Sequence, residues 1–319
     1  MFHYANGLRL TSIDLAIDVR RRQARGFVSH AHMDHLAPHE LTFCTPASAR
    51  LIQHRIGKRL MHEMPYDEPL EWDGVRLTTF PAGHILGSAM LLAEEGDTSL
   101  LYTGDFKLGA SATAEPARPP HADVLVMETT FGKPQYRMPP RQKVVGELMG
   151  VVKQALEFGI TPVIQAYVVG KSQEVTRLLH EHGVPVSQHP LIHAVSRVYE
   201  ECGCSLGNYE LLRDEVPAGH AVVVPPRGQK AATVRLPPRC VTIAVTGWAV
   251  DERARFRLGV DYAFPLSDHA DYDELFECVE RVEPKVIYCT HGPVEFVERL
   301  RERGHDAHPL ASTQQLRLF

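Results

Sequence analysis

The chain has 319 residues, of which 44% are hydrophobic and 23% are charged, so it is long enough to bury one large core or two smaller ones. Its formal net charge is −5, which argues against a protein that coats nucleic acid nonspecifically, because such binding depends on many contacts between basic side chains and phosphates. A nuclease is not excluded, since bound divalent cations would offset part of the acidic total.

The sequence gives three indications of where the protein works. No run of eighteen apolar residues occurs, and the first residues show no basic segment followed by an apolar stretch. We therefore expect no membrane span and no signal peptide, and a cytoplasmic protein. The six cysteines are dispersed along the chain, which favours reduced, mostly buried thiols over a disulfide framework.

Short β-branched or aliphatic runs alternate with helical segments, which is the pattern of a layered α/β protein. In the first part of the chain the predicted strands end at residues that could do chemistry, as in a site supported by a sheet. The strands are predicted at 27–29, 75–80, 90–92, 100–102 and 124–127, and the residues at their ends are His30, His84, Asp105 and Glu128.

The pattern changes from about residue 140 onward to a second α/β unit. Its first elements are a helix at 141–157, a strand at 161–166 and a helix at 171–182, and strands at 221–224 and 241–245 continue it. A helix at 271–281 and a strand at 285–289 then resume the earlier pattern. The simplest account is one domain, residues 1–135 and 263–319, interrupted by an inserted domain, residues 136–262.

Directly behind the apolar pair Phe27-Val28, six residues hold four potential metal ligands: His30, His32, Asp34 and His35. On an extended segment His30 and His32 project to the same side, whereas the two later ligands diverge as the chain turns, so one segment can supply two neighbouring metals. Imidazoles and a carboxylate form the ligand set that suits Zn²⁺, with Mn²⁺ or iron as alternatives. The ordinary alternative is a polar, histidine-rich turn after a strand.

Three further strand-end residues complete a candidate metal site. His84 is surrounded by small residues that would let the backbone approach a metal closely. The carboxylate of Asp105 could bridge two ions, and a turn or helix cap is its ordinary alternative. His291 repeats the strand-end arrangement. Each residue has a structural explanation by itself, but the three together indicate a metal site.

This set of residues, together with Asp18, resembles the metallo-β-lactamase fold and, more specifically, the β-CASP nucleases. The additional marks of that group follow in order at Glu128, His269 and His291, and Gly170-Lys171-Ser172-Gln173 matches the group's Gly-Lys-x-Gln segment. Three segments of the chain are most similar to bacterial ligase-associated DNA exonucleases: Tyr-Thr-Gly-Asp-Phe-Lys, Glu-Thr-Thr-Phe-Gly and Ser-Asp-His-Ala-Asp.

The resemblance implies a four-layer αββα metallo-β-lactamase fold with an inserted α/β β-CASP domain. It also implies two divalent metal ions, zinc or manganese, and a role for each motif residue. One metal would be held by His30, His32 and His84, the second by Asp34, His35 and His291, and Asp105 would bridge them. Asp18 would orient the histidine loop from outside the ligand set.

The resemblance assigns the remaining residues to catalysis and substrate binding. His269 would contact the scissile phosphate and protonate the leaving oxygen, and Glu128 would hold its other ring nitrogen. Asp34 would take part in catalysis as well as in metal binding. Lys171 and Ser267 would contact substrate phosphate. Two dications roughly 3.5 to 4 Å apart would activate water and hold a phosphate oxygen for in-line attack.

We therefore expect a two-metal phosphodiesterase that acts on nucleic acid. DNA is favoured over RNA, because no separate KH, RRM or OB-like segment is visible. The expected activity is a single-strand DNA exonuclease, 5′ to 3′, in DNA repair, with a DNA ligase or helicase as a candidate partner. The alternatives are an RNA-processing β-CASP ribonuclease, a small-molecule metallo-hydrolase such as a lactonase, and a noncatalytic scaffold.

Overall fold

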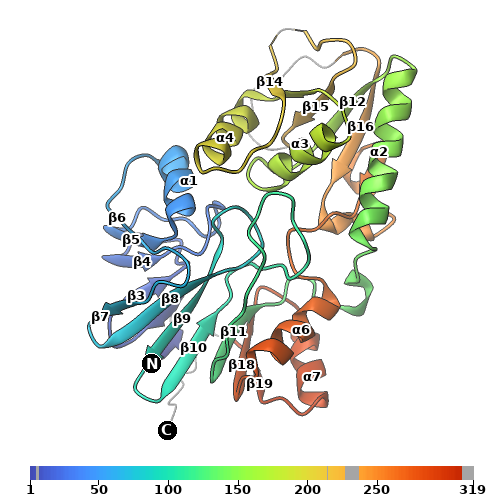
Figure 1. The fold of residues 1–319 in the computed structure, drawn as a ribbon. Coiled ribbons are helices and arrows are strands. Elements are labelled where there is room, and N and C mark those ends of the chain that lie inside the picture. Colours follow the sequence, from blue (N-terminus) through green and yellow to red (C-terminus); the bar gives the residue numbers. More distant parts are fainter. Residues whose placement is uncertain (5–6, 214, 227–236, 311–319) are drawn as a thin grey trace. The chain divides into compact units, whose positions relative to one another are not determined.

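The computed structural model describes residues 1–4, 7–213, 215–226 and 237–310. The chain packs into two compact units, which Figure 1 shows coloured along the sequence. Unit 1 comprises Met1–Ala110, Ala114–Pro134 and His269–Phe319, and unit 2 comprises Ser111–Thr113 and Gln135–Asp268. The predicted insert ended at residue 262, whereas unit 2 continues to Asp268, because the strand at Tyr262–Phe264 pairs within the sheet of unit 2.

The first sheet of unit 1, sheet A, has six strands in chain order. Strands β1 to β3 pair antiparallel and β3 to β6 pair parallel. Helix α1 (Pro46–Ile56) returns the chain between the parallel strands β5 and β6 and begins at Thr45, whose side chain accepts a hydrogen bond from the Ser48 amide. The strands are β1 (Phe2–Tyr4), β2 (Leu8–Leu10), β3 (Leu15–Ile17), β4 (Arg25–Phe27), β5 (Leu41–Cys44) and β6 (Met61–Glu63).

The second sheet of unit 1, sheet B, has seven strands in the order β19-β18-β11-β10-β9-β8-β7. From β7 to β10 the strands are antiparallel, and from β10 to β19 they are parallel. Their bounds are β7 (Leu70–Trp72), β8 (Val75–Pro81), β9 (Ala89–Glu95), β10 (Thr98–Tyr102), β11 (Val124–Glu128), β18 (Val286–Thr290) and β19 (Ala307–Pro309).

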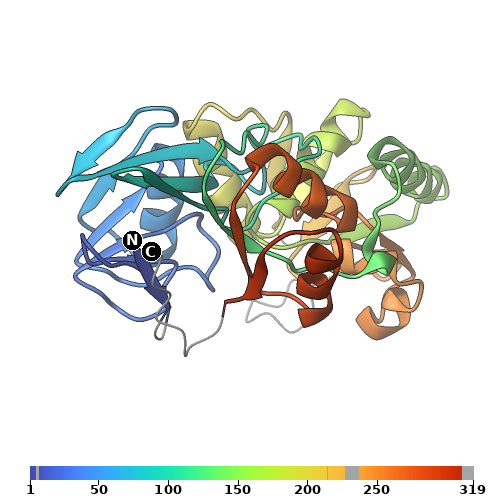
Figure 2. The same cartoon turned by 90° about the horizontal axis from the view of Figure 1, so that it is seen from below.

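The residues of β11 show how the layers of unit 1 are held together. Val124 and Val126 point into a core shared with sheet A, where they join side chains such as Phe27. Leu125 and Met127 point the other way and pack with helices α6 (Tyr272–Val282) and α7 (Val294–Glu302). Figure 2 shows these two helices side by side, seen from below. The predicted αββα arrangement is thereby confirmed.

Unit 2 is built on a six-stranded sheet, sheet C, in which every pair of neighbouring strands is parallel. Its strand order is β14-β13-β15-β12-β16-β17, and apolar residues of the helices and strands form its core. The strands are β12 (Thr161–Gln165), β13 (Val186–Gln188), β14 (Tyr209–Leu211), β15 (Ala221–Val224), β16 (Cys240–Val245) and β17 (Tyr262–Phe264). The helices are α2 (Arg141–Glu157), α3 (Lys171–Glu181), α4 (Pro190–Glu201) and α5 (Ala254–Leu258), with short 3₁₀ turns at Pro134–Tyr136 and Gly247–Val250.

Within the described residues, no helix is both long and apolar enough to cross a bilayer.

The packing of α7 against sheet B gives a test of the fold. Leu300 lies in this interface and is fully buried, whereas Leu60 is 68% exposed. Leu300→Ala should lower the free energy of unfolding by about 2–5 kcal/mol, because it leaves a cavity in the core. Leu60→Ala, the same change at an exposed site, should lower it by about 0.5 kcal/mol or less. Urea unfolding of both variants measures the difference, and equal losses would contradict the packing described for α7.

Candidate metal centre

The histidine-rich loop begins where β4 leaves sheet A. The predicted strand at 27–29 ends earlier, at Phe27, although the Val28 amide still donates to the Phe43 carbonyl. Ser29 leaves the sheet because its amide and its hydroxyl donate to the two carboxylate oxygens of Asp18, at 2.8 and 2.6 Å. The loop that follows therefore has a fixed starting direction before its first ligand, His30.

Three imidazole nitrogens converge in this loop and its surroundings. His32 Nδ1 lies 3.1 Å from His30 Nε2 and 3.0 Å from His84 Nε2. Asp105 Oδ2 lies 3.5 Å from His30 Nε2 and 3.9 Å from His84 Nε2. A tetrahedral Zn²⁺ ion with ligands at about 2.0–2.1 Å would separate its nitrogens by about 3.3 Å, which is close to the spacing found here. The first predicted ligand set thus fits a divalent ion.

The ring orientations of His30 and His35 are set by hydrogen bonds to their other nitrogens. His30 Nδ1 contacts the Ser29 hydroxyl at 2.9 Å, and His35 Nδ1 lies 2.8 Å from Asp18 Oδ2. The Tyr102 hydroxyl donates to the same Asp18 oxygen at 2.8 Å. Each ring therefore turns its Nε2 toward Asp105. Asp18 occupies the place expected of a residue that orients metal ligands from behind.

The second predicted ligand set is less tightly gathered than the first. His35 Nε2 lies 3.3 Å from Asp105 Oδ2 and 3.9 Å from Asp34 Oδ2. The ring centroids of His35 and His291 are 5.9 Å apart, and the side chains of Asp34 and His291 are exposed. Asp105 lies between the two sets, where a bridging ligand would stand. A second ion held by Asp34, His35 and His291 stays a prediction.

The pKa shifts of His30 and Asp105 favour cation binding, whereas that of His35 favours a proton. Burial lowers the pKa of His30 well below its ordinary value, and His35 and His84 act in the same direction, so its ring nitrogen keeps a lone pair. Burial would raise the pKa of Asp105, but His35 and His269 outweigh that effect and hold the pKa well below its ordinary value. Burial would lower the pKa of His35, but the carboxylates of Asp18 and Asp105 raise it well above its ordinary value. A bound cation would compete with that proton.

Glu128 and His269 form a second functional pair beside the histidine cluster. His269 Nδ1 lies 2.9 Å from Glu128 Oε1, which also accepts from the Phe106 amide at 3.0 Å. The other carboxylate oxygen accepts from the Thr130 hydroxyl and amide. The His269 ring lies 4.6 Å from that of His84, centroid to centroid. The structure therefore brings the predicted catalytic pair next to the first ligand set.

Parallel pairing of β11 with β18 places Glu128 opposite Thr290, one residue before His291. His291 has a left-handed backbone, with φ of 57°, and the next residue is Gly292. A Cβ atom at Gly292 would lie 2.0 Å from the Thr129 carbonyl oxygen, so the close approach of the two chain segments requires glycine.

Sequence reasoning assigned no role to three side chains that support the site: Ser29, Tyr102 and Thr130. Ser29 directly precedes His30, Tyr102 ends a predicted strand, and Thr130 lies two residues after Glu128. For Tyr102, the only signal in the sequence was its position at the end of a strand. Its hydroxyl bonds to Asp18, 84 residues away, and no local pattern indicates that partner.

Lys171 and Ser267, the predicted phosphate contacts, belong to unit 2. Lys171 is fully buried at the start of α3, where its ammonium lies 2.6 Å from Glu174 Oε2 and also forms an ion pair with Asp268. Burial would lower the pKa of Lys171, but these two carboxylates raise it, so the side chain is a cation held by acidic partners. Ser267 is buried as well. Phosphate contact by either residue stays a prediction.

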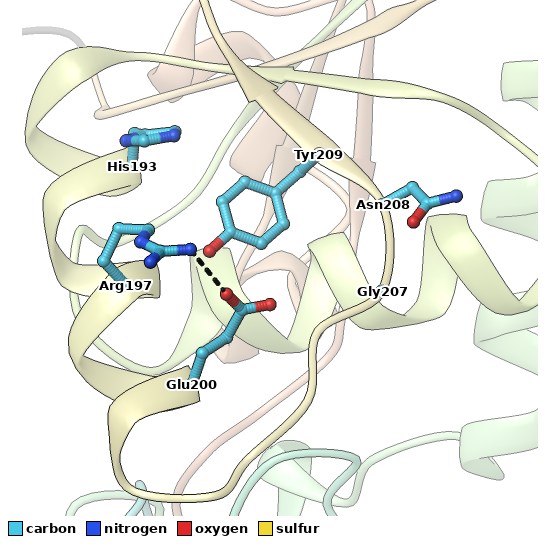
Figure 3. A pocket seen from close by; sticks show the side chains of 6 residues that line it. All are labelled: His193, Arg197, Glu200, Gly207, Asn208 and Tyr209. Atoms are coloured by element: carbon cyan, nitrogen blue, oxygen red, sulfur yellow. Dashed lines mark hydrogen bonds and ion pairs between the residues drawn. The ribbon is translucent and has the colours of Figure 1, made fainter.

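Unit 2 also has a surface pocket of about 580 Å³ that holds none of the predicted site residues (Figure 3). Arg197 and Glu200 lie one turn apart on α4, with Arg197 Nη1 3.2 Å from Glu200 Oε2, and the ring of Tyr209 lies beside them. Because the arginine already has an acidic partner, this pocket offers a phosphate little net positive charge.

Comparison with known proteins gives two kinds of match. Residues 255–310 of this chain, a range that includes His269 and His291, match the family described as the Zn-dependent metallo-hydrolase RNA specificity domain. The whole chain is similar to a protein of Opitutus terrae named as a probable DNA ligase, with 42% identity over 99% of this chain and 31% of that protein.

Two further relatives differ from each other in the substrate or activity that their names describe. An RNase J-like protein of Methanocaldococcus jannaschii is 28% identical over 53% of this chain and 48% of that protein. The 5′ exonuclease Apollo of Gallus gallus is 28% identical over 88% of this chain and 62% of that protein. The chain thus spans less than two thirds of the length of each of these relatives.

The hydrogen bonds of Asp18 give a test of its orienting role. Asp18→Asn should weaken zinc binding by about 10–100-fold, because the amide group would turn donor hydrogens toward Ser29 or His35. Asp14→Asn is the matched control: both residues have φ of 48°, but the side chain of Asp14 is 72% exposed. Competition with a chromogenic zinc chelator measures both affinities. Equal affinities in the two variants would show that Asp18 does not orient the ligands.

Proposed function

Because the chain belongs to the β-CASP group of metallo-β-lactamase-fold nucleases, we propose that it is a metal-dependent phosphodiester hydrolase acting on nucleic acid. The observation that carries this proposal is the convergence of His30, His32, His84 and Asp105 beside the Glu128–His269 pair. A metal cluster alone would serve many hydrolases. The adjoining histidine and its buried carboxylate add a proton donor for an oxygen leaving group.

The residues of the site divide the work between metal binding and proton transfer. His30, His32, His84 and Asp105 hold one divalent ion, zinc or manganese, and His35, Asp34 and His291 hold a second with Asp105. Such ions supply Lewis-acid activation of the phosphodiester and of water. Glu128 fixes the ring of His269 through Nδ1, and His269 gives its proton to the leaving oxygen.

We propose single-stranded DNA as the substrate, degraded from 5′ to 3′ during DNA repair in the cytoplasm. Support comes from the similarity over almost the whole chain to a protein named as a DNA ligase and from the similarity to a 5′ exonuclease. This chain matches 31% of the ligase-named relative, which makes a DNA ligase the first partner to test. RNA is the second candidate, because residues 255–310 match an RNA specificity domain.

Cleavage of end-labelled oligonucleotides tests both candidates. Matched DNA and RNA strands, each with a 5′-phosphate or a 5′-hydroxyl, are incubated with the protein in Mn²⁺ or Zn²⁺. Stepwise shortening of DNA from the 5′ end is the expected result. Preferential or internal cleavage of RNA would make RNA the substrate instead of DNA. Cleavage of lactones or thioesters, with no cleavage of any phosphodiester, would contradict the proposed nuclease activity.

Two substitutions separate metal binding from proton transfer. His269→Ala should lower kcat by about 10²–10⁴-fold without loss of metal, because it removes a proton donor but no ligand. Asp105→Ala should lose both activity and metal, since Asp105 lies within 4 Å of three candidate ligand histidines. His121→Ala is the control, because that side chain is 76% exposed. Metal content by mass spectrometry and initial rates are measured together, and normal cleavage by either site variant would reject its assignment.

A further inference from the structure

Unit 2 contains a network of two basic and two acidic side chains, of which Lys171 and Glu174 are buried. Lys171 is 1% exposed, Glu174 is 2% exposed and Asp268 is 12% exposed. The Lys171 ammonium contacts carboxylate oxygens of both acidic residues. Arg141, whose side chain is 28% exposed, places Nη2 2.7 Å from the second oxygen of Glu174. Buried charges of this kind hold fixed positions, because an unpaired charge in the interior is strongly unfavourable.

Asp268 lies at the point where the chain passes from unit 2 back to unit 1. It is the last residue of unit 2, and His269 is the first residue of the returning part of unit 1. The side chain of Asp268 is held by Lys171, and the side chain of His269 is held by Glu128. Beyond His269, the Ala270 amide donates to the Phe106 carbonyl at 2.6 Å, and Asp271 caps helix α6. The backbone is therefore anchored on both sides of the 268–269 peptide bond.

We propose that Lys171 is a positioning residue for His269 and acts through Asp268 rather than through substrate phosphate. The inference rests on the proposed function, in which His269 is the proton donor. Without the ion pair, the backbone torsions at Asp268 would lose their restraint, and the His269 ring would take up a wider range of positions. A misplacement of about 1 Å can cost on the order of 10²-fold in rate. This role explains why the lysine of the Gly-Lys-x-Gln segment is buried.

The test compares Lys171→Met, Asp268→Asn and the double variant with Lys143→Met, whose lysine is 67% exposed in helix α2 of the same unit. Rates are measured on a small chromogenic phosphodiester and on an oligonucleotide. Lys171→Met and Asp268→Asn should each lower kcat by about 10–100-fold on both substrates, with KM and metal content unchanged. The double variant should be no worse than either single one, because both remove the same restraint. Lys143→Met should match the unchanged protein.

Hydrogen–deuterium exchange gives a readout that does not depend on activity. Exchange of the amides in 265–271 should be faster in Lys171→Met and Asp268→Asn than in Lys143→Met, with the remainder of the chain unaltered. Unchanged exchange there, or unchanged kcat, would overturn the proposal. A rise in KM for the oligonucleotide alone would also overturn it, by making Lys171 a substrate contact. If Lys171→Met does not fold, Asp268→Asn decides by the same criteria.

The two proposals can fail separately. If the unchanged protein shows no phosphodiesterase activity that depends on His269, the proposed function fails, and the exchange data still report whether Lys171 restrains the segment. If His269→Ala is inactive while Lys171→Met and Asp268→Asn are normal, the positioning role fails alone.

Discussion

The carboxylate of Asp18 is the constraint on which the metal centre depends. One oxygen accepts the amide of Ser29, and the other accepts the hydroxyls of Ser29 and Tyr102 and contacts His35 Nδ1. These bonds end strand β4, start the histidine loop in one direction and turn His35 toward Asp105. Because Ser29 also contacts His30, a single buried carboxylate orients rings that belong to both predicted ligand sets.

Sheet B brings the remaining residues to the same place. Strands β10, β11 and β18 run parallel, so their carboxyl ends lie at one edge of the sheet. Asp105 follows β10, Glu128 ends β11 and His291 follows β18. These residues are far apart in the chain, and the insert separates the last of them from the others. These residues come together because the three strands run in the same direction. The insert between β11 and α6 leaves this strand arrangement intact.

Electrostatic compensation links the stability of this edge to what it binds. His30, His84 and Asp105 are buried and His32 is half-buried, and their nitrogens and carboxylate oxygen lie within 4.8 Å of one another. Burying such groups costs free energy unless a cation or a proton balances them. In unit 2 the buried charges of Lys171 and Glu174 are balanced by side chains, because the Lys171 ammonium contacts Glu174 and Asp268 and the half-buried Arg141 contacts Glu174.

The sequence by itself determined the types of ligand and the strands that carry them, because both depend on local spacing or alternation, and the resemblance to a known family implied the order of the layers. The His30 to His35 motif lies on one loop, and helix α2 has the predicted bounds. Only the tertiary structure decided that Ser29 leaves the sheet, that Tyr102 reaches Asp18, that β17 pairs in unit 2 and that Lys171 faces Asp268. These contacts join residues from 11 to 97 positions apart, and no local pattern encodes the partner of a buried polar group.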